Sequence, residues 1–141
     1  MGSENHASPC HERISGGLHH HHDSEHKGGH ACSKLISTSP IGNVPPDSCS
    51  HIYAPEKADR LASHSIHISS WQSRDLNEHK YGGAIRVGEF GELILSFSGL
   101  PEHADEALVL MVASDLLWTT REEVRAIVAL SDNPFISADS F

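Results

Sequence analysis

The sequence predicts a small α+β domain, and three observations lead to this prediction. An alternation of apolar and polar residues over 84–98 indicates a β-hairpin, and two segments with helical spacing, 101–117 and 120–131, follow it. Strands followed by helices are typical of α+β domains with antiparallel pairing. The length of 141 residues is that of one ordinary domain. We therefore expect a small antiparallel sheet packed with helices, in a single domain over 51–141.

The first 50 residues differ in composition from the rest of the chain. They contain eight of the 13 histidines and no Phe, Trp or Tyr. Their apolar side chains are too sparse to recover the conformational entropy that is lost on ordering. We therefore predict a disordered His-rich arm and linker over 1–50, which ends near the extended Pro45–Pro46 pair.

A short helix and a short strand are expected to open the domain. Pro55 suits the first position of a helix predicted near 55–64. Ile66 and Ile68 alternate with polar neighbours, which predicts a half-buried strand near 65–69.

The hairpin over 84–98 consists of two alternating segments around a glycine-bounded turn, Gly88–Gly91. One face of the two segments carries Ile85, Val87, Leu93, Leu95 and Phe97. This alternation, interrupted by a short turn, is the signature of a β-hairpin.

Two helices are predicted to follow the hairpin. Pro101 suits the first turn of the helix over 101–117, and acidic residues in that turn complement the positive end of the helix dipole. Apolar residues then occupy nearly every face of this helix, and Met111 is one of them. We therefore expect the helix to be almost wholly buried. Thr120 and Glu123 have the spacing of a capping box, which begins the helix over 120–131.

Charge, hydropathy and cysteine content limit the class of protein. The formal net charge of −9 argues against nucleic-acid binding, because phosphate contacts need clustered Lys and Arg. No stretch approaches the roughly 18 consecutive apolar residues that cross a bilayer, so no membrane span is expected. The start of the chain does not resemble a secretory signal, which favours a cytoplasmic protein. The odd number of cysteines (Cys10, Cys32 and Cys49) favours free thiols in a reducing compartment.

The densest group of potential metal ligands lies in the predicted arm. Its candidate ligands are His19, His20, His21, His22, His26, His30 and Cys32. Imidazole and thiolate groups suit zinc, nickel and copper ions. No fixed spacing defines a tetrahedral site, so three interpretations stay open: incidental composition, metal handling, or a remnant of an engineered tag.

Five residues of the domain are candidate ligand-binding residues. His64 and His67 would share a helix face and could hold a metal or a haem iron, although a strand that begins at Ser65 would separate them. The other three, Tyr81, Ser98 and His103, border the space between the hairpin and the helix over 101–117, where we expect any small-ligand pocket. For each histidine, a surface or hydrogen-bonded structural role is the simpler interpretation.

No established catalytic motif is present in the sequence. A nucleophile elbow, a metalloprotease helix and a phosphate-binding loop are all missing. A hydrolase that pairs His103 with Asp105 or Glu102 stays an alternative, but acidic residues in a first helical turn are expected for dipole reasons alone. We therefore assign no catalytic residue and favour a protein without enzymatic activity, while the question of catalysis stays open.

The segment Gly82–Ala113 carries one local resemblance. It runs through Gly82–Gly83, a strand, a turn, a strand that ends in Ser98–Gly99, a Pro101–Glu102 corner and the pair Asp105–Glu106 at a helix start. In this order the features resemble the C-terminal part of the GlcG / haem-degrading-protein-like (HbpS-like) family. The resemblance implies a PAS- or profilin-like α+β module, often oligomeric, that binds haem or another small ligand.

The preferred functional hypothesis is a non-enzymatic α+β module that binds a small ligand, with haem as one candidate, or associates with itself as a homo-oligomer. One alternative is a metal-handling protein that uses the arm to bind zinc or nickel. Another is an accessory protein that contacts a protein partner through Trp71, Phe90 or Trp118, because aromatic residues often anchor interfaces.

Overall fold

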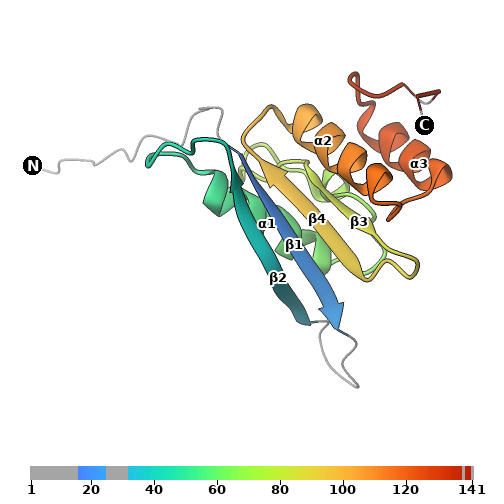
Figure 1. Ribbon diagram of the computed structural model, residues 1–141, viewed down its shortest axis with the longest axis horizontal. Helices are drawn as coiled ribbons and strands as arrows, with labels where there is room; N and C mark the ends of the chain where they lie inside the picture. Colours follow the sequence, from blue (N-terminus) through green and yellow to red (C-terminus); the bar gives the residue numbers. More distant parts are fainter. Residues whose placement is uncertain (1–15, 25–31, 138, 141) are drawn as a thin grey trace, which may run out of the picture.

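A four-stranded antiparallel sheet organises the chain in the computed structural model, which describes residues 16–24, 32–137 and 139–140 (Figure 1). The strands are β1 (Gly16–Ser24), β2 (Cys32–Ile41), β3 (Ala84–Val87) and β4 (Leu93–Ser98), in the spatial order β2-β1-β4-β3. The helices are α1 (Ser50–Ala62), the 3-10 helix η1 (Ser70–Ser73), α2 (Glu102–Asp115) and α3 (Arg121–Ser131). The predicted α+β class is thus confirmed.

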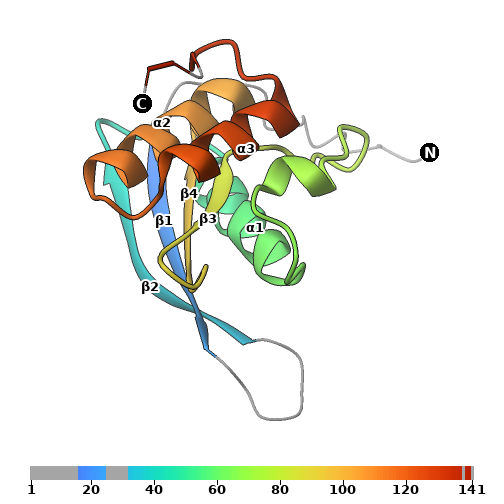
Figure 2. The same ribbon diagram turned by 90° about the vertical axis from the view of Figure 1, so that its right-hand side faces the viewer.

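Helices cover the sheet from both sides, with α1 on one face and α2 and α3 on the other (Figure 2). The smaller core lies under α1, where Leu61 and neighbouring alanines meet Ile94 of β4. The larger core lies under α2, where Val109 and Leu110 pack with Leu95 and the other inward residues of β3 and β4. The apolar face predicted for the hairpin is therefore the face that packs against α2.

Local signals at the helix starts account for two of the three α-helices. Thr120 and Glu123 form the predicted capping box: Thr120 Oγ1 accepts from Glu123 N at 3.2 Å, and Glu123 Oε2 accepts from Thr120 N at 2.7 Å. Pro101 lies directly before α2, whose first turn contains Glu102 and Asp105. The capping box gives hydrogen-bond partners to backbone N–H groups at the start of α3, which the helix itself leaves without partners. The acidic residues complement the positive end of the α2 dipole.

The start of α1 differs from the prediction. The helix begins at Ser50, five residues before Pro55, because the amides of Ile52 and Tyr53 already donate to the carbonyl of Cys49 at 2.9 and 3.0 Å. Pro55 lies inside the helix, where its missing N–H removes one hydrogen bond near the N-terminal end.

The strand predicted near 65–69 is also not formed as predicted. A tight turn occupies this position: His67 N donates to His64 O at 3.0 Å, and Ile66 is 86 % exposed. Only Ser69 makes a β-bridge, with Ile85. Its hydroxyl accepts from Trp71 N at 3.1 Å, so Ser69 caps η1 instead of continuing a strand. The alternation of Ile66 and Ile68 did not reflect a buried face.

Two stretches inside the predicted disordered arm are strands in the structure. β1 pairs with β4 on one side and with β2 on the other, so that Leu18 lies opposite both Phe97 and Ser39. The hairpin leaves one side of β4 open, and any backbone can supply ladder hydrogen bonds there, whatever its side chains. The amino-acid composition of the arm indicates only how many side chains can be buried. It therefore did not indicate that the backbone of the arm pairs with β4. The remaining parts of the predicted arm, 1–15 and 25–31, lie outside the described residues.

Two further observations concern α2 and the membrane. We expected α2 to be almost wholly buried, but Met111 is 54 % exposed and Asp115 is also exposed. Phe135, Ile136 and Ser140, from the chain that follows α3, lie beside Met111 and Asp115. Within the described ranges, no helix is long and apolar enough to cross a membrane.

Candidate functional site

A buried ion pair joins the helices on the two faces of the sheet. Lys57 of α1 donates from Nζ to Asp105 Oδ2 at 2.7 Å and to the carbonyl of Phe97 at 3.0 Å, and both charged side chains are only 2 % exposed. Asp105 Oδ1 also accepts from Leu100 N at 2.9 Å. Burial raises the pKa of Asp105 to about 6, although the Lys57 ammonium opposes this rise. Burial also lowers the pKa of Lys57.

The two glycines before β3 allow this close packing. A Cβ at Gly83 would lie 2.7 Å from Asp105 Cβ and 2.9 Å from Lys57 Nζ, and its φ of +115° disfavours other residues. A Cβ at Gly82 would overlap the Trp71 ring. The Gly82–Gly83 pair therefore has a structural explanation, namely the approach of backbone to a charged pair and an indole.

A second buried carboxylate, Glu106, connects α2 with the segments before β3 and after α3. Glu106 is fully buried, and its Oε2 accepts from the Ser69 hydroxyl at 2.9 Å. Its Oε1 accepts from Asn133 Nδ2 at 3.2 Å and from the hydroxyl of Ser131. Asn133 Nδ2 also donates to the carbonyl of His103 at 2.8 Å. These bonds hold the end of α3 against the start of α2.

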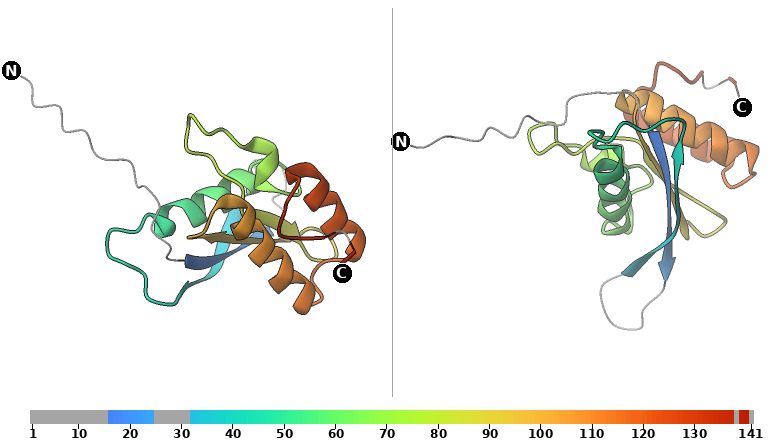
Figure 3. Two further views of the ribbon diagram at one scale, coloured as in Figure 1. Left: turned by 90° about the horizontal axis from the view of Figure 1, so that it is seen from above. Right: turned by 60° about the vertical axis from the view of Figure 1, so that its left-hand side comes forward.

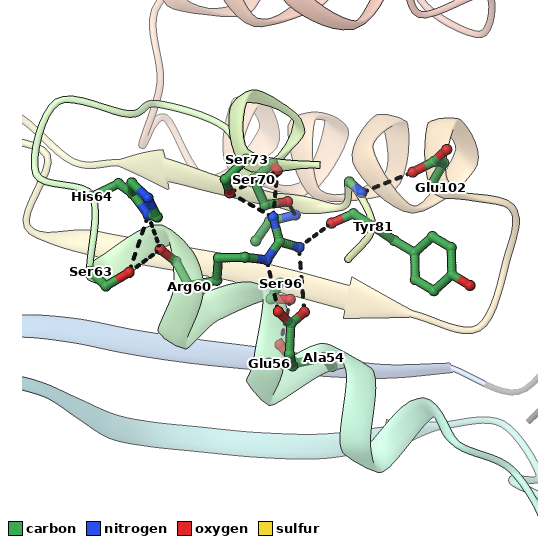
Figure 4. A network of polar contacts seen from close by, with 12 residues as sticks. Ala54, Glu56, Arg60, Ser63, His64, Ser70, Ser73, Tyr81, Ser96 and Glu102 are labelled. Carbon is green, nitrogen blue, oxygen red and sulfur yellow. Dashed lines mark hydrogen bonds and ion pairs between the residues drawn. The ribbon is translucent and has the colours of Figure 1, made fainter. Parts of the chain in front are cut away.

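Arg60 of α1 holds the η1 region in a similar way (Figure 4). Its guanidinium donates to Glu56 Oε1 at 2.7 Å, to the Ser70 carbonyl at 2.8 Å and to the Ser73 hydroxyl at 2.7 Å. It also donates to the Tyr81 carbonyl at 2.6 Å. The arginine thereby ties η1 and the chain before Gly82 to α1.

The hydrolase arrangement considered from the sequence is not assembled. His103 Nε2 donates to the carbonyl of Ser131 at 2.9 Å, and its ring lies 4.4 Å from the Trp71 ring. Asp105 bonds to Lys57 instead, and Glu102 forms an ion pair with Arg74. The buried carboxylates of α2 thus stabilise the fold and are closed to a substrate.

The pocket expected between the hairpin and the helix over 101–117 is filled. Core side chains of β3, β4 and α2 occupy that space: Ile85, Val87, Leu95, Phe97, Val109 and Leu110. Of the three residues expected to border it, Ser98 is buried at the end of β4 and His103 is held by Ser131. Tyr81 makes an edge contact with Tyr53 at 5.4 Å, and its hydroxyl lies 3.0 Å from His79 Nδ1. The structure does not bring the three around one cavity.

His64 and His67 lie together, but as a stacked pair. Their rings are 4.5 Å apart and nearly parallel, and His64 Nδ1 donates to the Arg60 carbonyl at 2.7 Å. His67 Nδ1 is buried and has no hydrogen-bond partner among the described atoms. Partial burial lowers the pKa of His67, and neighbouring His64 and Arg86 lower it further. Parallel stacking differs from the convergent arrangement of two metal ligands.

The predicted metal ligands of the arm are only partly within reach of the structure. The backbone of His19, His20, His21 and His22 runs in the middle of the sheet as part of β1, Cys32 opens β2, and His26 and His30 lie outside the described residues. Where side chains are described, no group of three or more His, Cys, Asp or Glu comes together.

Cys49, directly before α1, is disulfide-bonded. The prediction that all three cysteines are free thiols is therefore wrong for this residue. Disulfides are typical of oxidising compartments, so the thiol argument for a cytoplasmic location no longer holds.

One groove lies on the outer side of α2, and the sequence did not indicate it. We call it the α2 groove; it has a volume of about 310 Å³ and is lined by Met111, Asp115, Phe135, Ile136 and Ser140. Phe135 is 64 % exposed, whereas Ile136 is 7 % exposed and belongs to the main core. The only signal in the sequence was the apolar pair Phe135–Ile136 directly after a helix stop.

The buried cluster around Glu106 positions one wall of the α2 groove. Asn133, which Glu106 holds, accepts from Phe135 N at 3.0 Å through its side-chain oxygen. The chain after α3 is thereby directed back along α2 toward Met111. The buried hydrogen bonds of Glu106 thus help to position Phe135 in the wall of the α2 groove.

No family model, curated protein or solved structure matches the chain. The resemblance to the GlcG-like family therefore stays a prediction. The three histidines considered as possible ligand-binding residues have contacts within the fold: His103 is bonded to Ser131, and His64 and His67 stack on each other. None of the three lines the α2 groove.

Proposed function

We propose that this protein is a non-enzymatic binding module that takes an amphipathic cation, an apolar body with a positively charged end, into the α2 groove. The observation that carries the proposal is the combination in one groove of exposed Met111 and Phe135 with the Asp115 carboxylate.

The apolar wall supports the first half of the proposal. Met111 and Phe135 are more than half exposed, so a ligand that covers them would remove apolar surface from water. Methionine adapts its shape readily and is common at surfaces that accept varied ligands. A volume of about 310 Å³ is at the small end of the range for ligand sites, which suits a short chain or a single side chain.

The charge at the end of α2 supports the second part of the proposal, namely that the ligand carries a positive charge. Asp115 is the last residue of α2, and the last turn contains no basic residue. A negative side chain is unfavourable at the negative end of a helix dipole, so a cation bound there would be stabilised by both. The net charge of −9 would also attract cations to the molecule.

The buried contacts around Glu106 support a groove that exists before any ligand arrives. Glu106 accepts three hydrogen bonds and so fixes Asn133, which in turn fixes the backbone of Phe135. A preformed site binds more tightly because less conformational freedom is lost on binding.

Octylammonium is a suitable probe, with octanoate as its counterpart of opposite charge, both below their micelle concentrations. We expect isothermal titration calorimetry to detect octylammonium binding and much weaker octanoate binding. Asp115→Asn should weaken octylammonium binding roughly two- to fivefold, as expected for an exposed ion pair. Glu89→Gln, which removes a charge from the exposed turn between β3 and β4, is the matched control and should have no effect.

Equal affinity for octylammonium and octanoate would contradict the role of Asp115. NMR chemical-shift changes on addition of octylammonium would locate the binding site. Changes located away from Met111 and Phe135 would contradict binding in the α2 groove.

Three further predictions, about nucleic acid, location and metal handling, remain proposals. The negative charge supports the view that nucleic acid is not a partner. A cytoplasmic location is not supported by the disulfide at Cys49, and metal handling by the arm rests on residues whose side chains lie outside the described part.

A further inference from the structure

The two edges of the sheet differ in how they are covered. At the β3 edge, Arg86 N donates to the Ile68 carbonyl at 2.9 Å and Gly88 N donates to the Trp118 carbonyl at 2.8 Å. A bridge between Ser69 and Ile85 closes the same edge further. β2 is the opposite edge, with β1 as its neighbour and no described strand beyond it (Figure 3). Among the described residues, this ten-residue strand therefore has no strand on its outer side, and its register with β1 shifts once, at Ile36.

The middle of β2 lacks the residues that normally prevent edge strands from pairing. Lysine and proline are typical protective residues at sheet edges. Here Lys34 and Pro40 stand near the two ends of the strand, and the residues between them, 35–39, carry neither charge nor proline. Leu35 and Ile36 are 46 % and 53 % exposed, and Ile41 is 51 % exposed. The middle of this edge is therefore uncharged, and Leu35 and Ile36 expose apolar side chains to water.

We propose that β2 pairs antiparallel with β2 of a second copy of this chain, so that the two sheets become one continuous sheet across a two-fold axis. An extended strand binds a sheet edge through main-chain hydrogen bonds. A two-fold interface uses the same patch on both copies, and an antiparallel pair of identical strands meets this condition. The second copy supplies a strand of equal length with the same exposed apolar residues.

Charge favours a second copy at this edge over other contacts between copies. The chain has a net charge of −9, so most pairs of surfaces would repel each other, but β2 contains no acidic residue. With Ser37, Thr38 or Ser39 facing its own copy at the axis, the two Lys34 residues are at least six residues apart along the strands. At about 3.3 Å per residue this is roughly 20 Å, which leaves little repulsion between them.

Sedimentation velocity of the full chain from about 1 to about 100 µM tests the proposal. The wild-type protein should form dimers. Thr38 is exposed in the middle of β2, so Thr38→Lys and Thr38→Glu each place like charges close together on one face of the joined sheet. Each variant alone should dimerise at least about tenfold more weakly. An equimolar mixture of the two should restore dimers, because opposite charges then face each other.

The mixture separates the interface from misfolding, since two misfolded variants would not rescue each other. Ile66→Lys, which adds the same charge at an exposed site on the turn after α1, is the matched control and should dimerise like the wild type. Asp115→Asn should also dimerise like the wild type, so that failure at the α2 groove and failure at β2 are distinguishable. A wild-type monomer at the highest concentration would overturn the proposal. Dimerisation of both Thr38 variants with wild-type affinity, or no rescue on mixing, would overturn it equally.

Discussion

The two halves of the sheet use the same backbone pairing but differ in burial. β3 and β4 lie between α1 and the α2–α3 layer, and their apolar side chains are almost all inaccessible to water. In β2, by contrast, the side chains of residues 34–41 are all exposed. We call β3 and β4 the closed half of the sheet, and residues 34–41 of β2 the open half. Backbone hydrogen bonds are common to both, so the comparison teaches that side-chain burial, not strand pairing, distinguishes them.

The largest expected effect breaks the charged link at the end of the closed half. Lys57→Met leaves the ionised Asp105 carboxylate buried without its counter-charge, which should lower the free energy of unfolding by about 3–5 kcal/mol at a pH above the pKa of Asp105. Urea denaturation followed by circular dichroism measures this. Replacing both residues, as Lys57→Met with Asp105→Leu, should cost clearly less than Lys57→Met alone. If the double variant is as unstable as the single variant, an uncompensated buried charge does not explain the loss of stability.

A matched pair of leucines compares the two halves directly. Leu110 is fully buried against the closed half, so Leu110→Ala should lower the free energy of unfolding by about 2–5 kcal/mol. Leu35 of the open half is nearly half exposed, so Leu35→Ala should change it by less than about 0.5 kcal/mol. Both are read from urea denaturation at low protein concentration. Similar losses from the two substitutions would contradict the division into halves.

The most gradual effect is the pH dependence that comes from Asp105, because it is spread over the range between pH 3.8 and about 6. Burial raises its pKa from the usual 3.8 to about 6 in the folded state, so between these values the folded state holds a proton that the unfolded state has released. This contribution is present at low pH and is lost as pH rises through 6, at up to about 1.4 kcal/mol per pH unit. A carbon-13 NMR titration of the Asp105 carboxyl should give a midpoint well above 3.8. A midpoint near 3.8 would contradict this burial effect.

Elements with local signals were predictable from the sequence. The hairpin, α2 and α3 follow from period-two alternation, apolar spacing and the Thr120–Glu123 capping box, all of which depend on residues a few positions apart. Local signals also misled at Pro55, which lies inside α1 and not at its start, and at Ile66 and Ile68, which alternate in a segment that folds as a turn. Alternation over so short a stretch does not distinguish a strand from a turn.

Contacts between distant residues were not predictable. Lys57 and Asp105 are 48 positions apart, and Ser69 and Glu106 are 37 apart. Each of the two carboxylates, taken alone, is explained by the dipole of α2. Nothing in the spacing indicated that a lysine and a serine would reach them in the interior. The α2 groove was missed for the same reason, since its walls come from two segments that meet only in the fold.

Local sequence signals were enough to predict the α+β class, the hairpin and the two C-terminal helices, because periodicity and caps act within a few residues of each other. The pairing of β1 and β2, the buried partners of Asp105 and Glu106, and the position of the α2 groove became visible only in the folded chain. The physical reason is that backbone hydrogen bonds can form at almost any sequence, and buried charges need a partner wherever the folded chain brings one near.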